Sequence, residues 1–286
     1  CAPKLINRAA HSGQTSSEGA LPGSAMIEEH LEERTACRSA PLLQIERGSN
    51  IFKMDFIEVV DGEVQLWWAS LEISEPEIER LRTILAPDEL RRAERFRVAA
   101  AARRFVGSRA GLRLILGRAT GVEPADVEFL FGEHGKPYLH GGELLFNATD
   151  SGDYFVVALS SAEVGVDLEV ARTLRHNHGL ARRVCTDREI EMLARAPEEE
   201  RDALLLRLWT CKEAALKAVG IGLSGGARNV EAEIPLNGAP RLSRLLDETD
   251  HWSLLFPALV PGLLCSVVVK GCDWRAESRQ FSLHST

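Results

Sequence analysis

The sequence has no apolar run long enough to cross a membrane. A membrane-spanning helix needs about 18 or more consecutive apolar residues, and no run of that length occurs among the 286 residues. The start of the sequence also lacks the basic segment and apolar stretch of a secretory leader. We therefore expect a cytoplasmic protein that does not bind membranes.

The cysteines lack the spacing of a metal site or a redox pair. The chain has 6 of them, and none forms a C-x-x-C pair or a zinc-binding pattern. We expect reduced side chains that serve mostly in packing. The cysteines are Cys1, Cys37, Cys185, Cys211, Cys265 and Cys272.

The chain also has no net positive charge. The formal net charge of −8 argues against nucleic acid as a general partner. Residues 91–118 are an exception, because this span contains many arginines and only one acidic residue, Glu94. Such a local basic surface fits a small polyanionic ligand or an acidic protein partner. The arginines are Arg91, Arg92, Arg95, Arg97, Arg103, Arg104, Arg109, Arg113 and Arg118.

The sequence does contain a pattern of a helix followed by strands, which occurs over residues 98–160 and again over 198–269. This pattern is consistent with an α+β fold. Residues 1–50 are rich in Ser, Gly, Ala and Pro without periodicity, which predicts a disordered N-terminal tail. A polar stretch over residues 172–179 predicts a loop, and the capping box over residues 186–189 predicts a short helix after it.

Residues 208–224 read LWTCKEAALKAVGIGLS and are expected to complete a long helix. Its start is indicated by Pro197 and the glutamates that follow, because acidic side chains favour the positive first turn. Glu213 and Lys217 lie four residues apart and therefore share one face. That face borders an apolar stripe, where a carboxylate and an ammonium group could line a cleft. An ordinary solvated ion pair is the alternative.

Residues 164–170 read VGVDLEV and are expected to form a strand. Because side chains alternate along a strand, Asp167 and Glu169 point to one side and Leu168 points to the other. Two such carboxylates, with a third from a helix, suit an oxygen-ligated divalent ion, most often magnesium held together with substrate phosphates. Acidic residues at a strand edge without a metal are the alternative.

These segments together resemble the 4′-phosphopantetheinyl transferases of the Sfp type, within the holo-carrier-protein synthase superfamily. The motifs are, in order, Gly135-Lys136-Pro137, Phe146-Asn147, GVDLE, and W-T-x-K-E-A-x-x-K-A-x-G-x-G-L-S. The resemblance runs from about Val64 to Val269. It implies two similar α+β halves in a pseudo-two-fold arrangement, each a small, mostly antiparallel sheet packed with helices, with the active site between them.

The resemblance also implies that the chain is divided into two halves with different binding roles. Residues 51–162 would form the N-terminal half, on the side of the coenzyme A phosphates. Residues 163–286 would form the C-terminal half, with magnesium and the catalytic helix. Chain length and the two halves favour a monomer.

By the same resemblance, the protein transfers the 4′-phosphopantetheine arm of coenzyme A to a serine of an apo acyl or peptidyl carrier protein and releases adenosine 3′,5′-bisphosphate. Asp167, Glu169 and Glu213 would hold Mg²⁺ on the pyrophosphate. Glu213 would also take the serine proton, and Lys217 would stabilise charge on the bridging phosphate. The residues expected to bind coenzyme A are Lys136, Arg92, Arg104, Thr149, Asp150 and Lys212.

For Lys212, we expect the stem to pack in the apolar stripe while the amine reaches its edge. The resemblance does not choose among carriers of fatty-acid, polyketide and peptide synthetases, and so leaves open a role in secondary metabolism. A non-catalytic coenzyme A or carrier-protein binding module of the same fold is the alternative function.

One position departs from the family pattern. After Phe-Asn the family usually has Ser-His-Ser, whose histidine contacts the coenzyme A phosphates, and this chain has Thr149-Asp150-Ser151. An ionised Asp cannot donate a hydrogen bond and repels phosphate. Either a nearby arginine neutralises Asp150, or it binds through magnesium or water, or the site is weakened. A local turn cap beside Gly152 is a further alternative.

Overall fold

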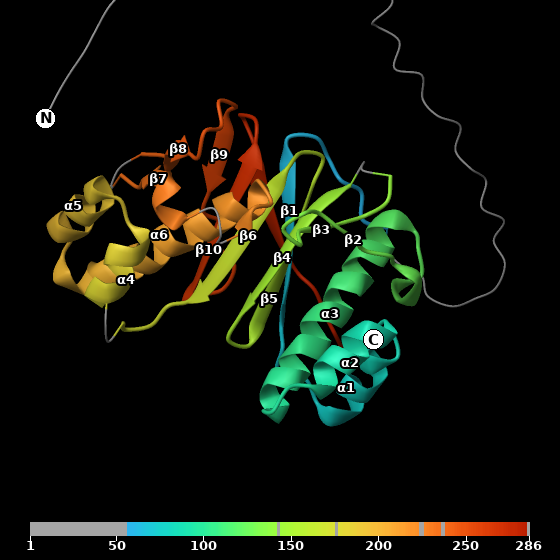
Figure 1. Ribbon diagram of the computed structural model, residues 1–286. Helices are drawn as coiled ribbons and strands as arrows, with labels where there is room; N and C mark the ends of the chain where they lie inside the picture. Colours follow the sequence, from blue (N-terminus) through green and yellow to red (C-terminus); the bar gives the residue numbers. More distant parts are fainter. Residues whose placement is uncertain (1–55, 142–143, 175–176, 223–225, 236–237, 285–286) are drawn as a thin grey trace, which may run out of the picture. The chain divides into compact units, whose positions relative to one another are not determined.

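The computed structural model describes residues 56–141, 144–174, 177–222, 226–235 and 238–284 (Figure 1). The expected tail, residues 1–50, lies outside these ranges, as do Cys1 and Cys37. Within them the chain alternates helices and small sheets, so the expected α+β class is confirmed. No helix in the described ranges is both long and apolar enough to cross a bilayer.

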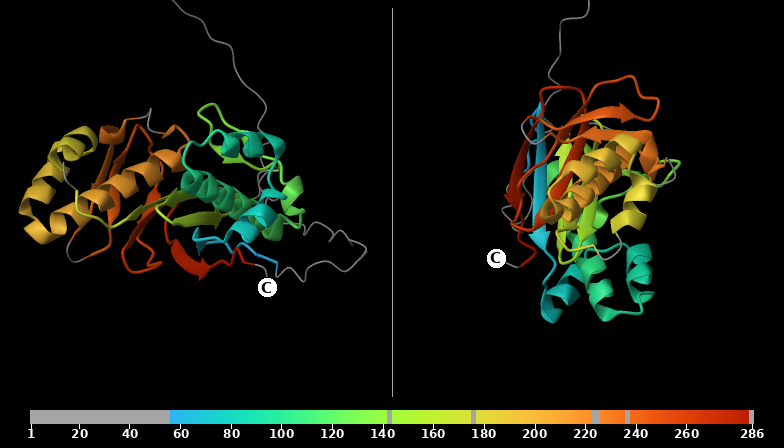
Figure 2. Two further views of the ribbon diagram at one scale, coloured as in Figure 1. Left: turned by 90° about the horizontal axis from the view of Figure 1, so that it is seen from below. Right: turned by 90° about the vertical axis from the view of Figure 1, so that its left-hand side faces the viewer.

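The first sheet has four strands in the order β11-β1-β5-β4 and is covered by helices α1 to α3. Strands β4 and β5 form an antiparallel hairpin, β1 is antiparallel to β5, and β11 is parallel to β1. Figure 2 shows β11 beside β1 in both views, although the two strands are far apart in sequence. The elements are β1 (Glu63–Ser70), α1 (Glu75–Arg82), α2 (Pro87–Glu94), α3 (Ala99–Thr120), η1 (Pro124–Asp126), β4 (Leu145–Ser151), β5 (Tyr154–Ser160) and β11 (Arg275–Gln280).

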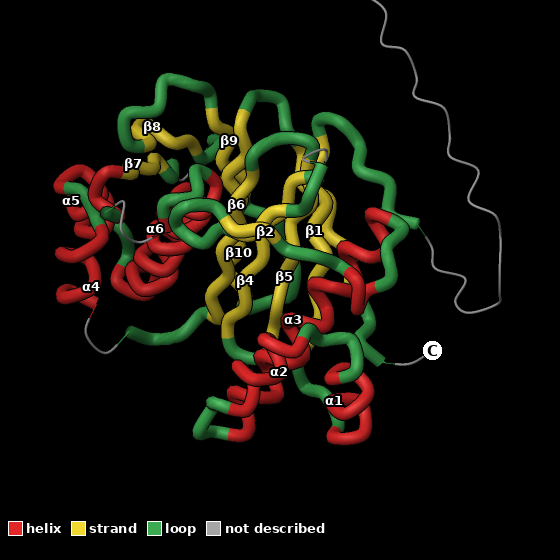
Figure 3. The backbone as a smooth tube through the Cα atoms, turned by 45° about the vertical axis from the view of Figure 1, so that its right-hand side comes forward, coloured by secondary structure: helices red, strands yellow, loops and turns green. Residues whose placement is uncertain are grey.

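The second sheet has three antiparallel strands in the order β6-β10-β9, and helix α6 packs on it (Figure 3). Two short ladders, β2-β3 and β7-β8, complete the sheets of the described residues. The remaining elements are β2 (Leu130–Phe131), β3 (Pro137–Tyr138), β6 (Val164–Val170), α4 (Asn177–Val184), α5 (Asp187–Arg195), α6 (Glu198–Ala218), η3 (Ala227–Asn229), β7 (Val230–Glu233), β8 (Arg241–Leu245), β9 (Trp252–Leu255) and β10 (Leu263–Lys270).

Strands β4 and β6 meet along a seam made by side chains. The buried Asn147 of β4 accepts a hydrogen bond from the backbone N–H of Val166 at 2.9 Å. Ser151, near the other end of β4, accepts from the backbone N–H of Val170 at 3.4 Å. Behind this seam the apolar side chains of β1, β5, β6 and β10 form one core cluster. The seam therefore fixes the position of β4 relative to β6.

The local sequence patterns predicted some elements correctly and missed others, among them α4 and β11. Helix α4 begins at Asn177, inside the stretch that was expected to be a loop. Strand β11 has the polar sequence RAESRQ, which has no apolar alternation to indicate a strand. The capping box at Thr186 was correct: the Glu189 N–H donates to the Thr186 hydroxyl at 3.4 Å, and the Thr186 N–H donates to the Glu189 carboxylate at 2.7 Å.

Helix α6 lies directly against β6 because Gly165 has no side chain. A Cβ atom at this position would lie 2.0 Å from the carbonyl oxygen of Ala214 and 2.4 Å from the backbone nitrogen of Ala218. Both neighbours are backbone atoms of α6, so a rotamer change cannot relieve the clash. The glycine of the GVDLE segment thus sets how closely the helix approaches the strand.

We expect Gly165→Ala to push α6 away from β6. Overpacking of this kind costs roughly 1–3 kcal/mol of unfolding free energy, and sometimes more. Gly179→Ala is the matched control, because Gly179 is exposed on α4 and a Cβ atom there would have no neighbour within 4 Å. Thermal unfolding and activity of both variants check this, and equal behaviour would contradict the close approach.

Candidate active site

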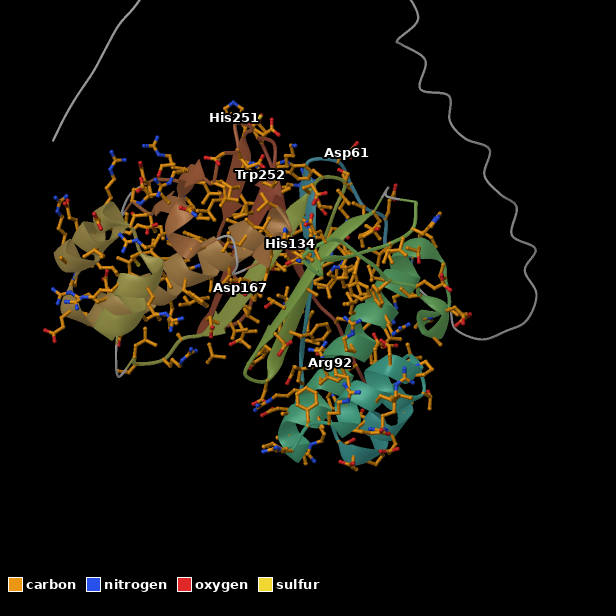
Figure 4. The ribbon with its side chains drawn as sticks, in the orientation of Figure 1. Asp61, Arg92, His134, Asp167, His251 and Trp252 are labelled. Carbon is orange, nitrogen blue, oxygen red and sulfur yellow. The ribbon has the colours of Figure 1, made fainter. Side chains whose placement is uncertain are left out.

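Helix α6 and strand β6 bring Lys217 onto Asp167. The Lys217 Nζ lies 2.6 Å from the Asp167 Oδ1, and it also donates to the carbonyl of Val166 at 3.3 Å and to the hydroxyl of Thr149 at 3.0 Å. Thr149 in turn donates to Asp167 at 3.2 Å. The alternation expected for β6 is present, since Leu168 lies in the core between the sheets while Asp167 faces α6. Figure 4 labels Asp167 on this strand.

Glu213 lies one helical turn before Lys217 and is 8% exposed. Its Oε1 is buried and has no hydrogen-bond partner. Burial and the negative charges of Asp167 and Glu169 raise the pKa of Glu213 to about 7, against an opposing effect of Lys217. A carboxyl group with such a pKa can exchange a proton near neutral pH.

The carboxylates of β6 differ in their surroundings. Burial raises the pKa of Asp167, although Lys217 acts to lower it. Glu169 is half-buried and accepts hydrogen bonds from the Ser151 hydroxyl at 3.0 Å and from Arg172 at 2.8 Å. Asp167 therefore faces a lysine of α6, and Glu169 faces an arginine that follows the strand.

Asp150 lies within strand β4, paired with Phe155 across the hairpin. Desolvation by surrounding atoms raises the pKa of its carboxyl group, while the positive charges of Lys217 and Arg104 lower it. Arg104 itself pairs with Asp153 at 2.7 Å. Among the alternatives left open for Asp150, a nearby arginine that offsets its charge is consistent with these interactions.

A cleft of about 530 Å³ opens beside the C-terminal end of α6. Lys136 lines it, donating to the carbonyl of Ala218 at 2.7 Å and pairing with Glu163 at 2.7 Å. His134 and Trp252, both labelled in Figure 4, line it too. The sequence motifs indicated Lys136 but gave no sign of Trp252, because an isolated tryptophan at a strand start is equally typical of a core.

The basic surface expected over residues 91–118 is only partly real. Arg109 and Arg113 pair with the buried Glu89 at 2.6 and 2.7 Å, and Arg113 is itself 3% exposed. These two arginines are therefore neutralised by an acid that lies just before the span. Arg92 is exposed and stacks on Phe105, with 5.1 Å from its Cζ to the ring centroid. It lies among the helices of the first sheet (Figure 4).

Lys212 does not reach the edge of the apolar stripe, so that expectation is wrong. It is 0% exposed, and its Nζ lies 2.8 Å from Glu189, which is equally buried. The reason is helical geometry: Lys212 points toward α5 and β7, whereas Glu213, one residue further along, points toward β6. Lys212 is not available to a ligand in this arrangement.

Of the four cysteines in the described ranges, three behave as packing residues. Cys185, Cys211 and Cys265 are free and buried, and burial raises the pKa of Cys211 to about 12. Cys272 is free and exposed. The thiol next to Lys212 is therefore protonated at neutral pH and is a poor nucleophile.

The carboxylates at the α6–β6 junction have some of the properties of a cation site. As they stand in the described part of the chain, no three His, Cys, Asp or Glu side chains form a group that could hold a metal ion. Three features nevertheless fit a divalent cation: the donors are all carboxylates, the charges of Asp167 and Glu169 both raise the pKa of Glu213, and one Glu213 oxygen is buried without a partner. A cation here would relieve both the repulsion and the unpaired oxygen.

Comparison with known proteins gives a consistent result. A family model described as the 4′-phosphopantetheinyl transferase superfamily matches residues 163–267. The 4′-phosphopantetheinyl transferase HetI of Nostoc sp. is 38% identical over 226 residues, covering 77% of this chain and 92% of that protein. The 4′-phosphopantetheinyl transferase Sfp of Bacillus subtilis is 26% identical over 153 residues, covering 53% of this chain and 67% of that protein.

Among solved structures, the holo-[acyl-carrier-protein] synthase of Neisseria meningitidis aligns with 38% of this chain and 98% of that chain. The identity is 23% and the TM-score 0.33, a likeness too low to bear on the architecture.

Proposed function

The chain belongs to the 4′-phosphopantetheinyl transferase superfamily, enzymes that transfer phosphopantetheine from coenzyme A to carrier proteins, and we propose that its reaction takes place where α6 meets β6. One observation carries this proposal. Lys217 binds Asp167, while Glu213, one turn earlier on the same helix, feels the charge of Asp167 and keeps a buried oxygen with no partner. An ordinary surface ion pair would not be buried in this way.

Magnesium is the cation that this donor set fits best. Asp167, Glu169 and Glu213 would hold it, and it would supply positive charge to the pyrophosphate of coenzyme A. Lys217 is the counter-ion of Asp167 in the present arrangement and lies beside the same charges. We infer that Lys217 neutralises phosphate charge during transfer.

Glu213 is the proposed general base. It would accept the proton of the carrier serine hydroxyl as that oxygen attacks the β-phosphorus, with adenosine 3′,5′-bisphosphate as the leaving group. Without a bound cation the pKa of Glu213 is about 7, so this carboxylate can take up a proton near neutral pH. The serine must therefore approach the α6–β6 junction.

Coenzyme A would extend from this junction over two sets of residues, one in the cleft and one on the first sheet and its helices. Lys136 lines the cleft with Tyr138 and Trp252, whose rings suit a nucleotide base. Arg92, Arg104 and Thr149 belong to the first sheet and its helices, and are proposed to contact phosphates there. Lys212 is left out of this set because it is buried against Glu189.

Asp150 would lie beside these phosphates, and we expect Asp150→His to retain or improve coenzyme A binding. Lys217 and Arg104 stay paired with Asp167 and Asp153, but both also feel the charge of Asp150, so its removal should strengthen their attraction for phosphate. Imidazole carries a positive charge at mildly acidic pH, where the gain should be largest. Calorimetric titration with coenzyme A at pH 6 and pH 8 checks this. Loss of transfer in folded Asp150→Ala would instead make Asp150 a working ligand.

The function is tested by the mass of a carrier protein after incubation with coenzyme A and Mg²⁺. Transfer adds the phosphopantetheine mass to one serine, and a Ser→Ala carrier is the control. Carriers from fatty-acid, polyketide and peptide synthetases, assayed side by side, identify the pathway. Coenzyme A binding without a mass shift on any carrier would favour the non-catalytic alternative. We further propose that the protein is a cytoplasmic monomer. Sedimentation would check the oligomeric state.

A further inference from the structure

The buried pair of Lys212 and Glu189 lies outside the proposed site, but Lys212 directly precedes Glu213 in the chain. Both side chains have 0% exposed area, and the two charges are 2.8 Å apart. Removing two charges from water offsets much of their mutual attraction, so a dry ion pair adds little to stability by itself. Its contacts indicate what else it does.

Glu189 connects α5 to strand β7. One carboxylate oxygen accepts from the backbone N–H of Thr186 at 2.7 Å, which closes the cap of α5. The other accepts from the backbone N–H of Ala232 in β7 at 2.9 Å. Both oxygens are thus held by backbone groups, and the carboxylate has a fixed position.

Lys212 adds helix α6 to this connection. Besides the ion pair with Glu189, its ammonium group donates to the carbonyl of Ala227 at 3.0 Å and to that of Val230. An ammonium group has three protons, and it is surrounded here by three oxygens, two from carbonyls and one from Glu189. One point of α6 is therefore attached to α5, η3 and β7 at the same time.

Attachment at this point sets the rotation of α6 about its axis. Successive residues of a helix differ by about 100° in direction, so fixing Lys212 toward β7 fixes the direction of Glu213. Gly165 sets how closely the same helix approaches β6 on another face. The two contacts together determine where Glu213 and Lys217 lie relative to Asp167.

We propose that Lys212 is a positioning residue that aims Glu213 and Lys217 at β6 and does not itself touch coenzyme A. This inference rests on the proposed function of Glu213. Lys212 was expected from the sequence to bind coenzyme A directly, and loss of such a contact would raise KM. A positioning role acts on the chemical step, and its loss would lower kcat.

Lys212→Met tests the inference, because methionine keeps most of the stem but removes the charge and all three donors. We expect kcat to fall by roughly 10–100-fold, the usual effect of a misplacement of about 1 Å. The KM for coenzyme A should change much less than kcat, because Lys212 does not touch the ligand and acts only through Glu213 and Lys217. Calorimetric binding of coenzyme A without Mg²⁺ should likewise match wild type.

Arg113→Met is the control for a purely structural loss. Arg113 and Glu89 form another ion pair of low exposure, 4% and 6%, at 2.7 Å. Arg113 also donates to backbone carbonyls, but it belongs to α3, which packs in the core of the first sheet and away from α6. This variant should lower the melting temperature while its folded fraction keeps the wild-type kcat.

The double variant Lys212→Met with Glu189→Gln removes both charges and is expected to fold, because replacing a whole buried pair is far milder than breaking one. Its kcat should remain low. A wild-type kcat in either folded Lys212 variant overturns the inference, as does a tenfold rise in KM for coenzyme A with kcat kept. If wild type itself fails to modify any carrier, the proposed function is at fault and not the role of Lys212.

Discussion

Asp167→Asn is expected to lower transfer by roughly three orders of magnitude, the upper range for loss of one charge-stabilising group, while the protein stays folded. Asparagine has the same shape and can still accept hydrogen bonds from Thr149 and Lys217. It lacks the charge that balances Lys217 at 2.6 Å and that would hold Mg²⁺. Glu169→Ala should act in the same direction, because it removes a second negative donor.

The matched control is Asp187→Asn. Asp187 also pairs with a cation, Arg228 at 3.0 Å, but its side chain is 91% exposed on α5. Exposed pairs of this kind contribute little to stability, and this one is not part of the proposed site. Transfer rates at limiting Mg²⁺ and melting curves should be measured for all variants. Wild-type activity of Asp167→Asn under these conditions would remove the metal assignment.

Glu213→Gln is expected to lower kcat by two to four orders of magnitude, about the contribution of a well-placed general base. Glutamine keeps the size of the side chain but cannot accept the serine proton. Without metal the pKa of Glu213 is about 7, and Mg²⁺ bound to this carboxylate lowers it, so the rise of wild-type activity with pH should lie at or below pH 7 and should be absent from the variant. Rates from about pH 5.5 to 8.5, on either side of that pKa, measure both effects. A variant that turns over like wild type would reduce the Glu213–Lys217 arrangement to a structural pair.

The same substitution should stabilise the metal-free protein at high pH. The folded-state pKa of Glu213 is raised from 4.5 to about 7, so its contribution to stability is fully present below pH 4.5 and is lost as the pH rises through 7. In EDTA at pH 8, Glu213→Gln should therefore unfold with a free energy on the order of 2–3 kcal/mol above that of wild type. Near pH 5 the two should be similar, and Mg²⁺ at pH 8 should favour wild type.

The order of motifs in the sequence was sufficient to predict the class of fold and the family. The alternation of VGVDLEV correctly predicted that Asp167 and Leu168 face opposite sides of β6. Helical spacing correctly predicted that Glu213 and Lys217 share a face. Periodicity of this kind predicts which side chains of one element point the same way. The proposed site depends on this property in both β6 and α6.

Interactions between distant elements were not accessible in the same way. The sequence of α6 alone did not show that Lys212 would be buried against a carboxylate. Its partner, Glu189, comes from helix α5. The arginines of α3 were counted without Glu89, because the acid that neutralises two of them comes from α2. Partners that are remote in sequence can be identified only once the fold brings them together.

Strand β11 has a consequence for the order in which the protein can fold during synthesis. Residues 275–280 pair in parallel with residues 63–68 of β1, and Arg275 also binds Glu63 at 2.9 Å. A ribosome releases the start of the chain first, so β1 leaves it long before its neighbour has been made. Until then the nascent sheet has an uncovered edge at β1, which other chains could join. Among the described strands, the last to be made is thus the one that covers this edge of β1.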